Sequence, residues 1–177
     1  MTMRTIARCA SGRLAPTTLA LLLLALALPA KDAAAQSDKD LVGTWTLVSV
    51  DNVRPDGSKV PLFAPSPQGI LMFDANSRYS IQICSTGRPK FASNDRMKGS
   101  PEENQAAVHG CNPHWGRYSV NATDRVIVFQ IDHATYTNWE GTEQKRSFTL
   151  TGDELKYSVP NPSATGANPV VVWKRAK

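Results

Sequence analysis

The sequence of 177 residues lacks the motifs that usually identify an enzyme. It has no Ser, His and Asp in an order typical of a hydrolase triad, no carboxylate pair at an interpretable glycosidase spacing, and no glycine-rich phosphate loop. It also shows no internal repeat and no low-complexity segment. These absences disfavour an enzymatic function, and nothing in the sequence indicates a cofactor.

A hydrophobic segment long enough to cross a membrane is also missing. The apolar run over residues 19–28 falls well short of the ~20 residues that a spanning helix needs. Arginines precede this run, and a stretch of alanines ending at Ala35 follows it. This order predicts a secretory signal peptide over residues 1–35, with cleavage after Ala35 or, alternatively, after Ala30. A retained anchor is the competing interpretation. With cleavage, we expect a periplasmic or secreted protein without a stable membrane span.

The chain has little excess of one charge once the predicted signal peptide is removed. The net charge of the whole sequence is +5, but 16 basic and 14 acidic residues remain after residues 1–35, and they are scattered. Nucleic-acid binding needs a concentrated basic face, so we expect no nucleic-acid partner. We interpret residues 36–40 as a linker and residues 41–177 as one domain, which is large enough for a single core.

Cysteine is scarce, with three residues in all. Cys9 lies in the predicted signal peptide, which leaves Cys84 and Cys111. In an exported protein two remaining thiols most simply form a disulfide, which here closes a loop of about 27 residues. The alternative is a zinc site that adds His109 and His114, although this ligand spacing is irregular and the compartment favours oxidation. We expect the disulfide and no metal, with both histidines as solvent-facing loop residues.

Short alternating segments dominate the chain and predict about nine β-strands joined mainly by turns. The first, residues 41–50, contains Gly43 and Trp45, whose indole can plug the end of a barrel or sandwich. Sequence neighbours look like hairpin partners throughout. The fold class is therefore all-β, and we expect an antiparallel up-and-down barrel of about 8–10 strands rather than an immunoglobulin-like sandwich. The other predicted strands cover residues 59–63, 70–74, 78–84, 115–120, 125–133, 142–150, 155–159 and 170–175.

The segment 85–114 is the one long interruption of the strand pattern. Within it Ser100, Pro101 and Glu103 form a capping-box sequence, and Gly110 is a stop signal. We therefore expect one short helix near residues 101–109. An insertion of this length is either a lid or binding loop, or surface decoration held by the disulfide.

Six short motifs of the predicted strands and turns can be compared with known families; they lie at residues 43–45, 56–57, 69–73, 78–80, 139–146 and 150–155. Together they resemble the lipocalin-like domain found in bacterial and fungal proteins. The resemblance implies a calycin-type barrel whose interior takes a small, largely apolar ligand. It also implies that Lys174 or Arg175, from the last strand, covers the indole of Trp45. The chain lacks the long first connecting loop of true lipocalins, so their ligand entrance does not transfer, and the family offers no catalytic set. The resemblance covers about residues 41–175.

The direction of the strands predicts where a ligand would bind. If nine strands alternate in direction, the long connections all lie at the end of the barrel where the first strand begins, and the tight turns close the other end. Long, variable loops at one rim are typical of a binding site. The connections concerned lie near residues 64–69, 85–114, 134–141 and 160–168.

Polar and aromatic residues near this rim are the candidates for binding a ligand. His133 ends an apolar row that includes Phe129 and Ile131, and Arg146 begins another, so both are expected to face the interior. The competing interpretations are that Arg146 pairs with Asp132 or Glu140, and that His133 only ends a strand. The predicted ligand-binding residues are Trp45, His133, Trp139 and Arg146.

The leading functional prediction is an exported lipocalin-like protein that binds a small hydrophobic or amphipathic molecule, with Arg146 favouring a carboxylate or other anionic head group. One alternative is a barrel enzyme of isomerase or cyclase type, with His133 as acid and base and Arg146 as oxyanion partner. Another is a structural envelope protein with a filled core.

Overall fold

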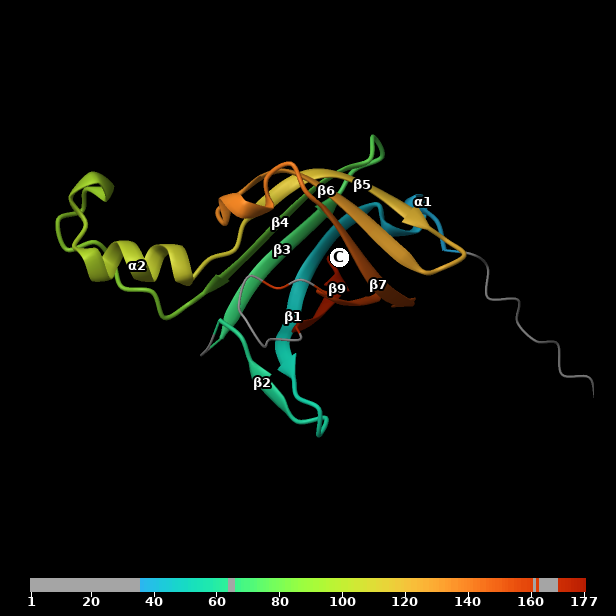
Figure 1. Cartoon of the computed structure of the whole chain (residues 1–177), viewed down its shortest axis with the longest axis horizontal. Coiled ribbons are helices and arrows are strands. Elements are labelled where there is room, and N and C mark those ends of the chain that lie inside the picture. The colour runs from blue at the N-terminus through green and yellow to red at the C-terminus, as the bar shows by residue number, and fades with distance from the viewer. Residues whose placement is uncertain (1–35, 64–65, 161, 163–168) are drawn as a thin grey trace, which may run out of the picture. The chain divides into compact units, whose positions relative to one another are not determined.

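The computed structural model describes residues 36–63, 66–160, 162 and 169–177 (Figure 1). The predicted signal peptide, residues 1–35, lies outside the described residues. Within the described ranges, no helix is both long enough and apolar enough to cross a membrane.

The described residues form an antiparallel sheet of nine strands. Each strand from β3 to β8 pairs with the next, β1 pairs with both β2 and β3, and the pairing of β1 with β9 closes the sheet into a barrel. The predicted all-β antiparallel barrel is therefore confirmed. The strands are β1 (Gly43–Val53), β2 (Lys59–Pro61), β3 (Pro67–Phe73), β4 (Arg78–Ser85), β5 (His114–Asn121), β6 (Val126–Ala134), β7 (Glu143–Thr151), β8 (Glu154–Ser158) and β9 (Pro169–Arg175).

Side chains that alternate along the strands line the interior, mostly with apolar groups. In β4 the side chains of Tyr79, Ile81 and Ile83 are buried, as their predicted shared face requires. The ring of Phe129 from β6 contacts that of Tyr79 edge to face, with centroids 4.7 Å apart. Such aromatic contacts across the barrel bury large areas and stabilise its closure.

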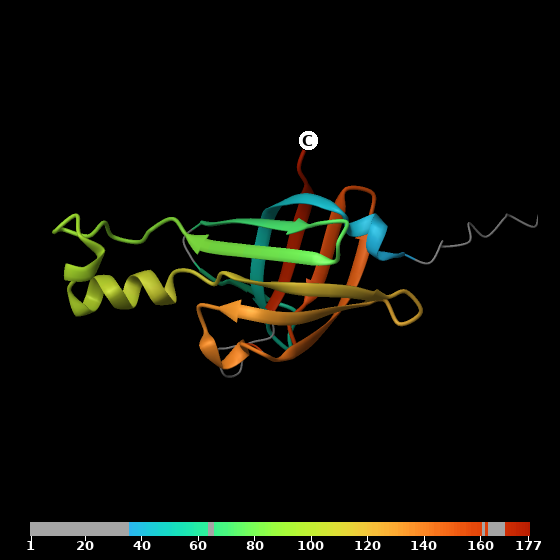
Figure 2. The same ribbon diagram turned by 90° about the horizontal axis from the view of Figure 1, so that it is seen from above.

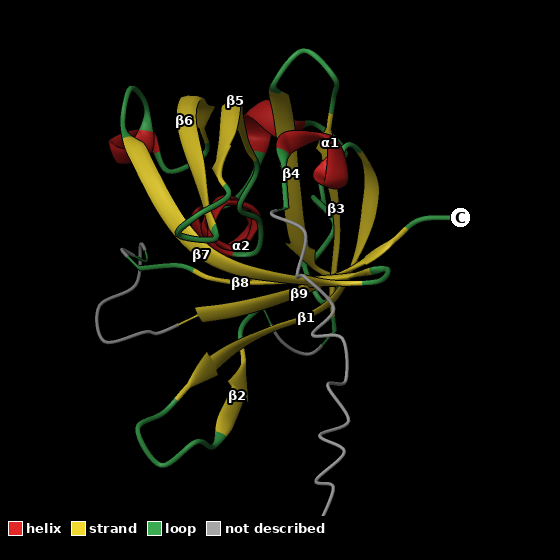
Figure 3. Cartoon of the chain, turned by 90° about the vertical axis from the view of Figure 1, so that its right-hand side faces the viewer, coloured by secondary structure: helices red, strands yellow, loops and turns green. Residues whose placement is uncertain are grey.

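The long connections share one rim, as predicted, but the predicted end is wrong. The strand β2 pairs only with residues 51–53 of β1, and both β2 and β3 run antiparallel to β1 (Figure 3). The chain therefore does not reverse its direction between β2 and β3. The loop-rich rim lies where β1 ends, whereas the β3–β4 turn lies where β1 begins, next to the Gly43 and Phe73 pair.

The end of the barrel at the start of β1 is sealed. Trp45 is completely buried there, and its Nε1 donates a hydrogen bond of 2.9 Å to the carbonyl oxygen of Leu41. Leu41 ends a short helix, α1 (Asp38–Leu41), which includes part of the segment expected to be a linker. The guanidinium of Arg175 lies 4.2 Å from the centroid of the Trp45 ring, so the implied cover from the last strand is Arg175.

The insertion between β4 and β5 contains the predicted helix, α2 (Pro101–His109), with a capping box formed by Ser100 and Glu103. Figure 2 shows the insertion extending away from the barrel. A disulfide between Cys84 and Cys111 joins its C-terminal end to β4. This bond confirms the predicted pairing and uses both sulfur atoms that the alternative zinc site needs.

We predict that replacing both cysteines by serine lowers the free energy of unfolding by roughly 3–4 kcal/mol, because the loop between them spans 27 residues. Chemical denaturation of the wild type and the double variant measures the difference. The wild type assayed with a reductant should match the double variant, and equal stabilities of the oxidised wild type and the variant would contradict the prediction.

Candidate functional site

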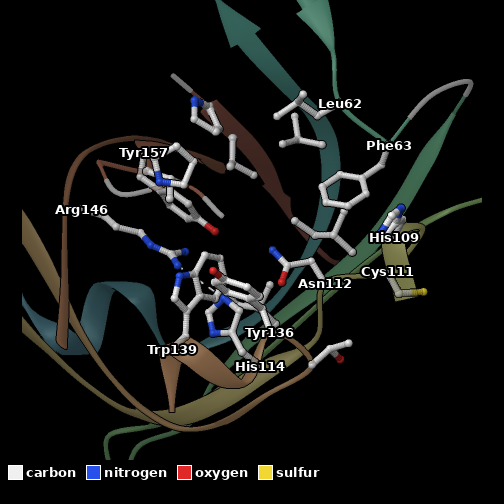
Figure 4. Close-up of a pocket in the computed structure, with 18 of the residues that line it drawn as sticks. Leu62, Phe63, His109, Cys111, Asn112, His114, Tyr136, Trp139, Arg146 and Tyr157 are labelled. Atoms are coloured by element: carbon white, nitrogen blue, oxygen red, sulfur yellow. Dashed lines mark hydrogen bonds between the residues drawn. The ribbon is translucent and has the colours of Figure 1, made fainter. Parts of the chain in front are cut away.

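A cavity of about 560 Å³ lies inside the barrel and reaches the loop-rich rim (Figure 4). Its walls come from the inward-facing residues of β1, β4, β5, β7, β8 and β9, and its mouth from the segments that connect the strands. A cavity of this size lies in the range of small-molecule sites, ~300–1,000 Å³. The apolar wall residues are Val50, Ile81, Ile83, Val159 and Val171.

Arg146 places a buried charged group in the cavity wall. Strand β7 alternates regularly, so the side chain of Arg146 points inward and is only 2% exposed. Its Nη2 donates to Oε1 of Gln144 over 2.8 Å, and its guanidinium carbon lies 4.5 Å from the ring centroid of Phe129 and 5.1 Å from that of Tyr157. These contacts orient the guanidinium without neutralising it.

No ion pair neutralises Arg146 within the part of the chain that the structure describes. Its expected alternative partners are engaged elsewhere: Asp132 pairs with Arg78 at 3.1 Å, and Glu140 lies 3.4 Å from His133. The buried Nε of Arg146 has no hydrogen-bond partner among the described residues. Burying a cation that has an unused donor costs free energy.

His114 lies beside Arg146, which corrects the expectation that it faces solvent. The side chain is 2% exposed because β5 begins one residue earlier than predicted, so that His114, Gly116 and Tyr118 alternate inward. Extending the alternation of the predicted strand back by one residue would have predicted from the sequence that His114 faces the interior. His109 is exposed, as expected, but it also lines the mouth.

The imidazole of His114 connects Arg146 to Tyr79. Its Nε2 lies 3.4 Å from Nη2 of Arg146, and its Nδ1 lies 3.0 Å from the hydroxyl oxygen of Tyr79. A guanidinium can only donate, so Nε2 accepts and Nδ1 carries the proton. Burial lowers the pKa of His114 well below its usual value, and the charge of Arg146 lowers it further, so the ring is neutral.

His133 lies outside the cavity, so the prediction that it faces the interior is wrong. The ladder between β5 and β6 shifts where Trp115 pairs with His133 and Gly116 pairs with Ile131, which leaves Asp132 as an extra residue. The bulge reverses the alternation, and the side chain of His133 is 62% exposed. Its ring packs at 5.3 Å from that of Trp115 on the outer face.

Trp139 and Trp45 lie at different ends of the barrel. Trp139 ends a short 3₁₀ helix, η2 (Thr137–Trp139), and lines the cavity with its ring 5.6 Å from that of His114. Trp45 lies at the sealed end, because the long loops are at the end of β1 and not at its start, as predicted. The cavity thus brings together Arg146 and Trp139 of the four predicted residues.

Several residues that line the cavity were not predicted. Burial raises the pKa of Tyr157, so its hydroxyl stays protonated and can donate a hydrogen bond. Asn112 lies at the mouth, immediately after the disulfide (Figure 4).

The described residues contain no cluster of His, Cys, Asp and Glu suited to a metal ion.

Residues 42–176 match the lipocalin-like domain. The chain belongs to this family. A 4'-hydroxy-3'-methoxypropiophenone carrier protein, ppsC, from Aspergillus oryzae is 31% identical over 90 residues, which cover 47% of this chain and 80% of that protein. The structure of the fluorescent protein UnaG is 14% identical, with a TM-score of 0.36 over 78% of this chain and 98% of that one. A mutant of UnaG gives the same TM-score, and at this level the likeness carries no inference.

We predict that the buried, neutral His114 makes the fold less stable in acid. The unfolded chain binds a proton on this residue below pH ~6.5 and the folded chain does not, so the free energy of unfolding falls as the pH falls, by up to about 1.4 kcal/mol per pH unit. Denaturation between pH 7.5 and 5 should show a shallower slope for His114→Gln than for the wild type. The control is Ser119→Ala on the exposed face of β5, which replaces no titratable group and should keep the wild-type slope. Equal slopes for all three proteins would contradict the prediction.

We also predict that Gly116→Ala disrupts the bulge. A Cβ at residue 116 collides with the backbone carbonyl oxygen of Gln130, and backbone atoms cannot move aside cheaply. Thermal or chemical denaturation should show that the free energy of unfolding falls by ~1–3 kcal/mol. The control is Ser119→Ala on the exposed face of the same strand, which should stay within about 0.5 kcal/mol of the wild type. A Gly116→Ala variant as stable as this control would show that the close approach is not required.

Proposed function

We propose that this protein binds a small, mostly apolar molecule with an anionic group inside its barrel. The observation that carries the proposal is the guanidinium of Arg146, which is buried in the cavity wall and has no carboxylate partner in the described part of the chain. A carboxylate or similar head group would supply the missing negative charge and accept hydrogen bonds from the unused donors of the guanidinium.

The surroundings of Arg146 favour this mode of binding. Gln144 and the neutral His114 hold the guanidinium without cancelling its charge, so an entering anion does not have to displace a protein carboxylate. Pre-positioned donors reduce the entropic cost of binding. The apolar walls supply the remaining affinity, at about 25 cal/mol for each Å² of ligand surface that they remove from water.

The comparison with known proteins supports a carrier function in general terms. The fungal relative is named as the carrier of a small aromatic molecule, and its match covers 80% of that protein. We infer from this that transport or storage of a small molecule, without chemical conversion, is the function that fits the cavity. The enzyme alternative has no such support, because it needs His133 beside Arg146 and the side chain of His133 lies on the outer face.

A structural protein with a filled core fits less well, because the barrel contains a cavity. Export to an oxidising compartment remains part of the proposal, since the predicted signal peptide and the disulfide agree with it. N-terminal sequencing of protein recovered from the periplasm or medium tests this part. A chain that starts at Gln36 is expected, and an uncleaved chain retained in the cytoplasm would overturn it.

We predict that Arg146→Met selectively weakens the binding of anions. The probes are 2-naphthoate and its neutral methyl ester, measured by isothermal titration calorimetry at neutral pH. The variant should lose affinity for 2-naphthoate by about 2–3 kcal/mol, because a charge-assisted hydrogen-bonded pair disappears, and should retain its affinity for the ester.

The matched control is Arg117→Met, since Arg117 lies exposed on the outer face of β5. It should bind both probes as the wild type does. If neither probe binds the wild type, or if Arg146→Met binds 2-naphthoate as tightly as the wild type, the proposed function is wrong.

A further inference from the structure

The side-chain amide of Asn112 is a further polar group at the mouth of the cavity. Asn112 follows the disulfide at Cys111, and Figure 4 shows its side-chain amide pointing into the cavity, between Phe63 and Tyr136. The residue is half-buried. Within the described residues its side chain has no hydrogen-bond partner, so both its donor and its acceptor are free to bind a ligand.

The backbone around Asn112 is held on both sides. The amide nitrogen of Asn112 donates to the carbonyl oxygen of Ile83 over 2.8 Å, and the amide nitrogen of Thr135 donates to that of Pro113 over 3.0 Å. The disulfide between Cys84 and Cys111 fixes the preceding residue. The side-chain amide is therefore presented from a pre-organised segment, which is the condition for selective recognition.

The two polar groups lie at different depths. Arg146 lies within the barrel, where it pairs with Ile127 of β6, whereas Asn112 lies beyond Ile83, near the end of β4 at the loop-rich rim. Apolar side chains, including those of Ile83 and Val171, line the wall of the same cavity. A molecule that fills this cavity meets a cation at one end, an apolar middle and an amide at the other end.

We propose that the ligand has two polar ends, with an anionic group on Arg146 and a hydroxyl or carbonyl group on Asn112, joined by a rigid apolar body such as an aromatic ring system. The inference rests on the proposed binding function and narrows its ligand class. A molecule with an anionic head but no second polar group leaves the amide of Asn112 unpaired and binds more weakly, because a buried polar group loses its hydrogen bonds to water.

The test compares 2-naphthoate with hydroxylated derivatives that carry the hydroxyl at positions 5, 6 or 7, titrated by calorimetry into the purified protein. For the wild type, at least one hydroxylated probe should bind about tenfold more tightly than 2-naphthoate. In Asn112→Leu that ratio should fall to about one, because the amide that distinguishes the two probes is absent. The matched control is Gln82→Leu, an amide replaced on the exposed face of β4, which should keep the wild-type ratio.

A second measurement uses the wild-type protein, so its result does not depend on whether the variant folds. In ¹⁵N correlation spectra the side-chain amide signals of Asn112 should shift with the preferred hydroxylated probe and much less with 2-naphthoate. The inference is wrong if no hydroxylated probe gains affinity, or if the gain persists in Asn112→Leu. If 2-naphthoate binds through Arg146 in either case, the proposed function stands. If no probe binds at all, both are wrong.

Discussion

The pairing of β1 with β9 closes the sheet, and the enclosed interior with its cavity depends on this closure. The ladder runs from Trp45 and Arg175 at one end to Asn52 and Pro169 at the other, with one irregularity near Leu47. An open sheet would expose the inward side chains to water on one face. Closure turns that face into an interior in which the charge of Arg146 is buried and in which a cavity lies that opens at the loop-rich rim.

The two ends of the barrel have different roles. At the start of β1, Trp45 is buried beneath Arg175 and hydrogen-bonds to Leu41, which seals this end with a single packed cluster. At the other end the connections are long, and the insertion that carries α2 (Pro101–His109) is anchored to β4 by the disulfide. The cavity therefore opens at one rim only in the part of the chain that the structure describes.

The polar groups of the cavity are arranged to keep one positive charge available. His114 is neutral and Gln144 is uncharged, so both hold the guanidinium of Arg146 without compensating it. A protonated His114 would place a second positive charge within hydrogen-bonding distance, which burial and Arg146 together oppose. The same arrangement explains why acid is expected to weaken the fold and why an anion is expected to bind.

The amino-acid sequence by itself determined the local features of this protein. The period of two set the strands, the capping box set the limits of α2, and the regular alternation of β7 was enough to turn Arg146 inward. The two cysteines left after the predicted signal peptide sufficed for the disulfide. These features depend on neighbouring residues or on composition, so they can be predicted without the fold.

Only the tertiary structure decided which of these residues meet. The bulge at Asp132, where β6 approaches Gly116 closely, turned His133 outward, and local alternation contains no sign of it. The strand β2 runs in the same direction as β3, so the long connections lie at the end of β1 and Trp45, at its start, lies at the sealed end. The burial of His114 beside Arg146 likewise required the barrel to close. Register and strand direction are set by pairing between distant segments, and that pairing is decided by the packing of the whole core.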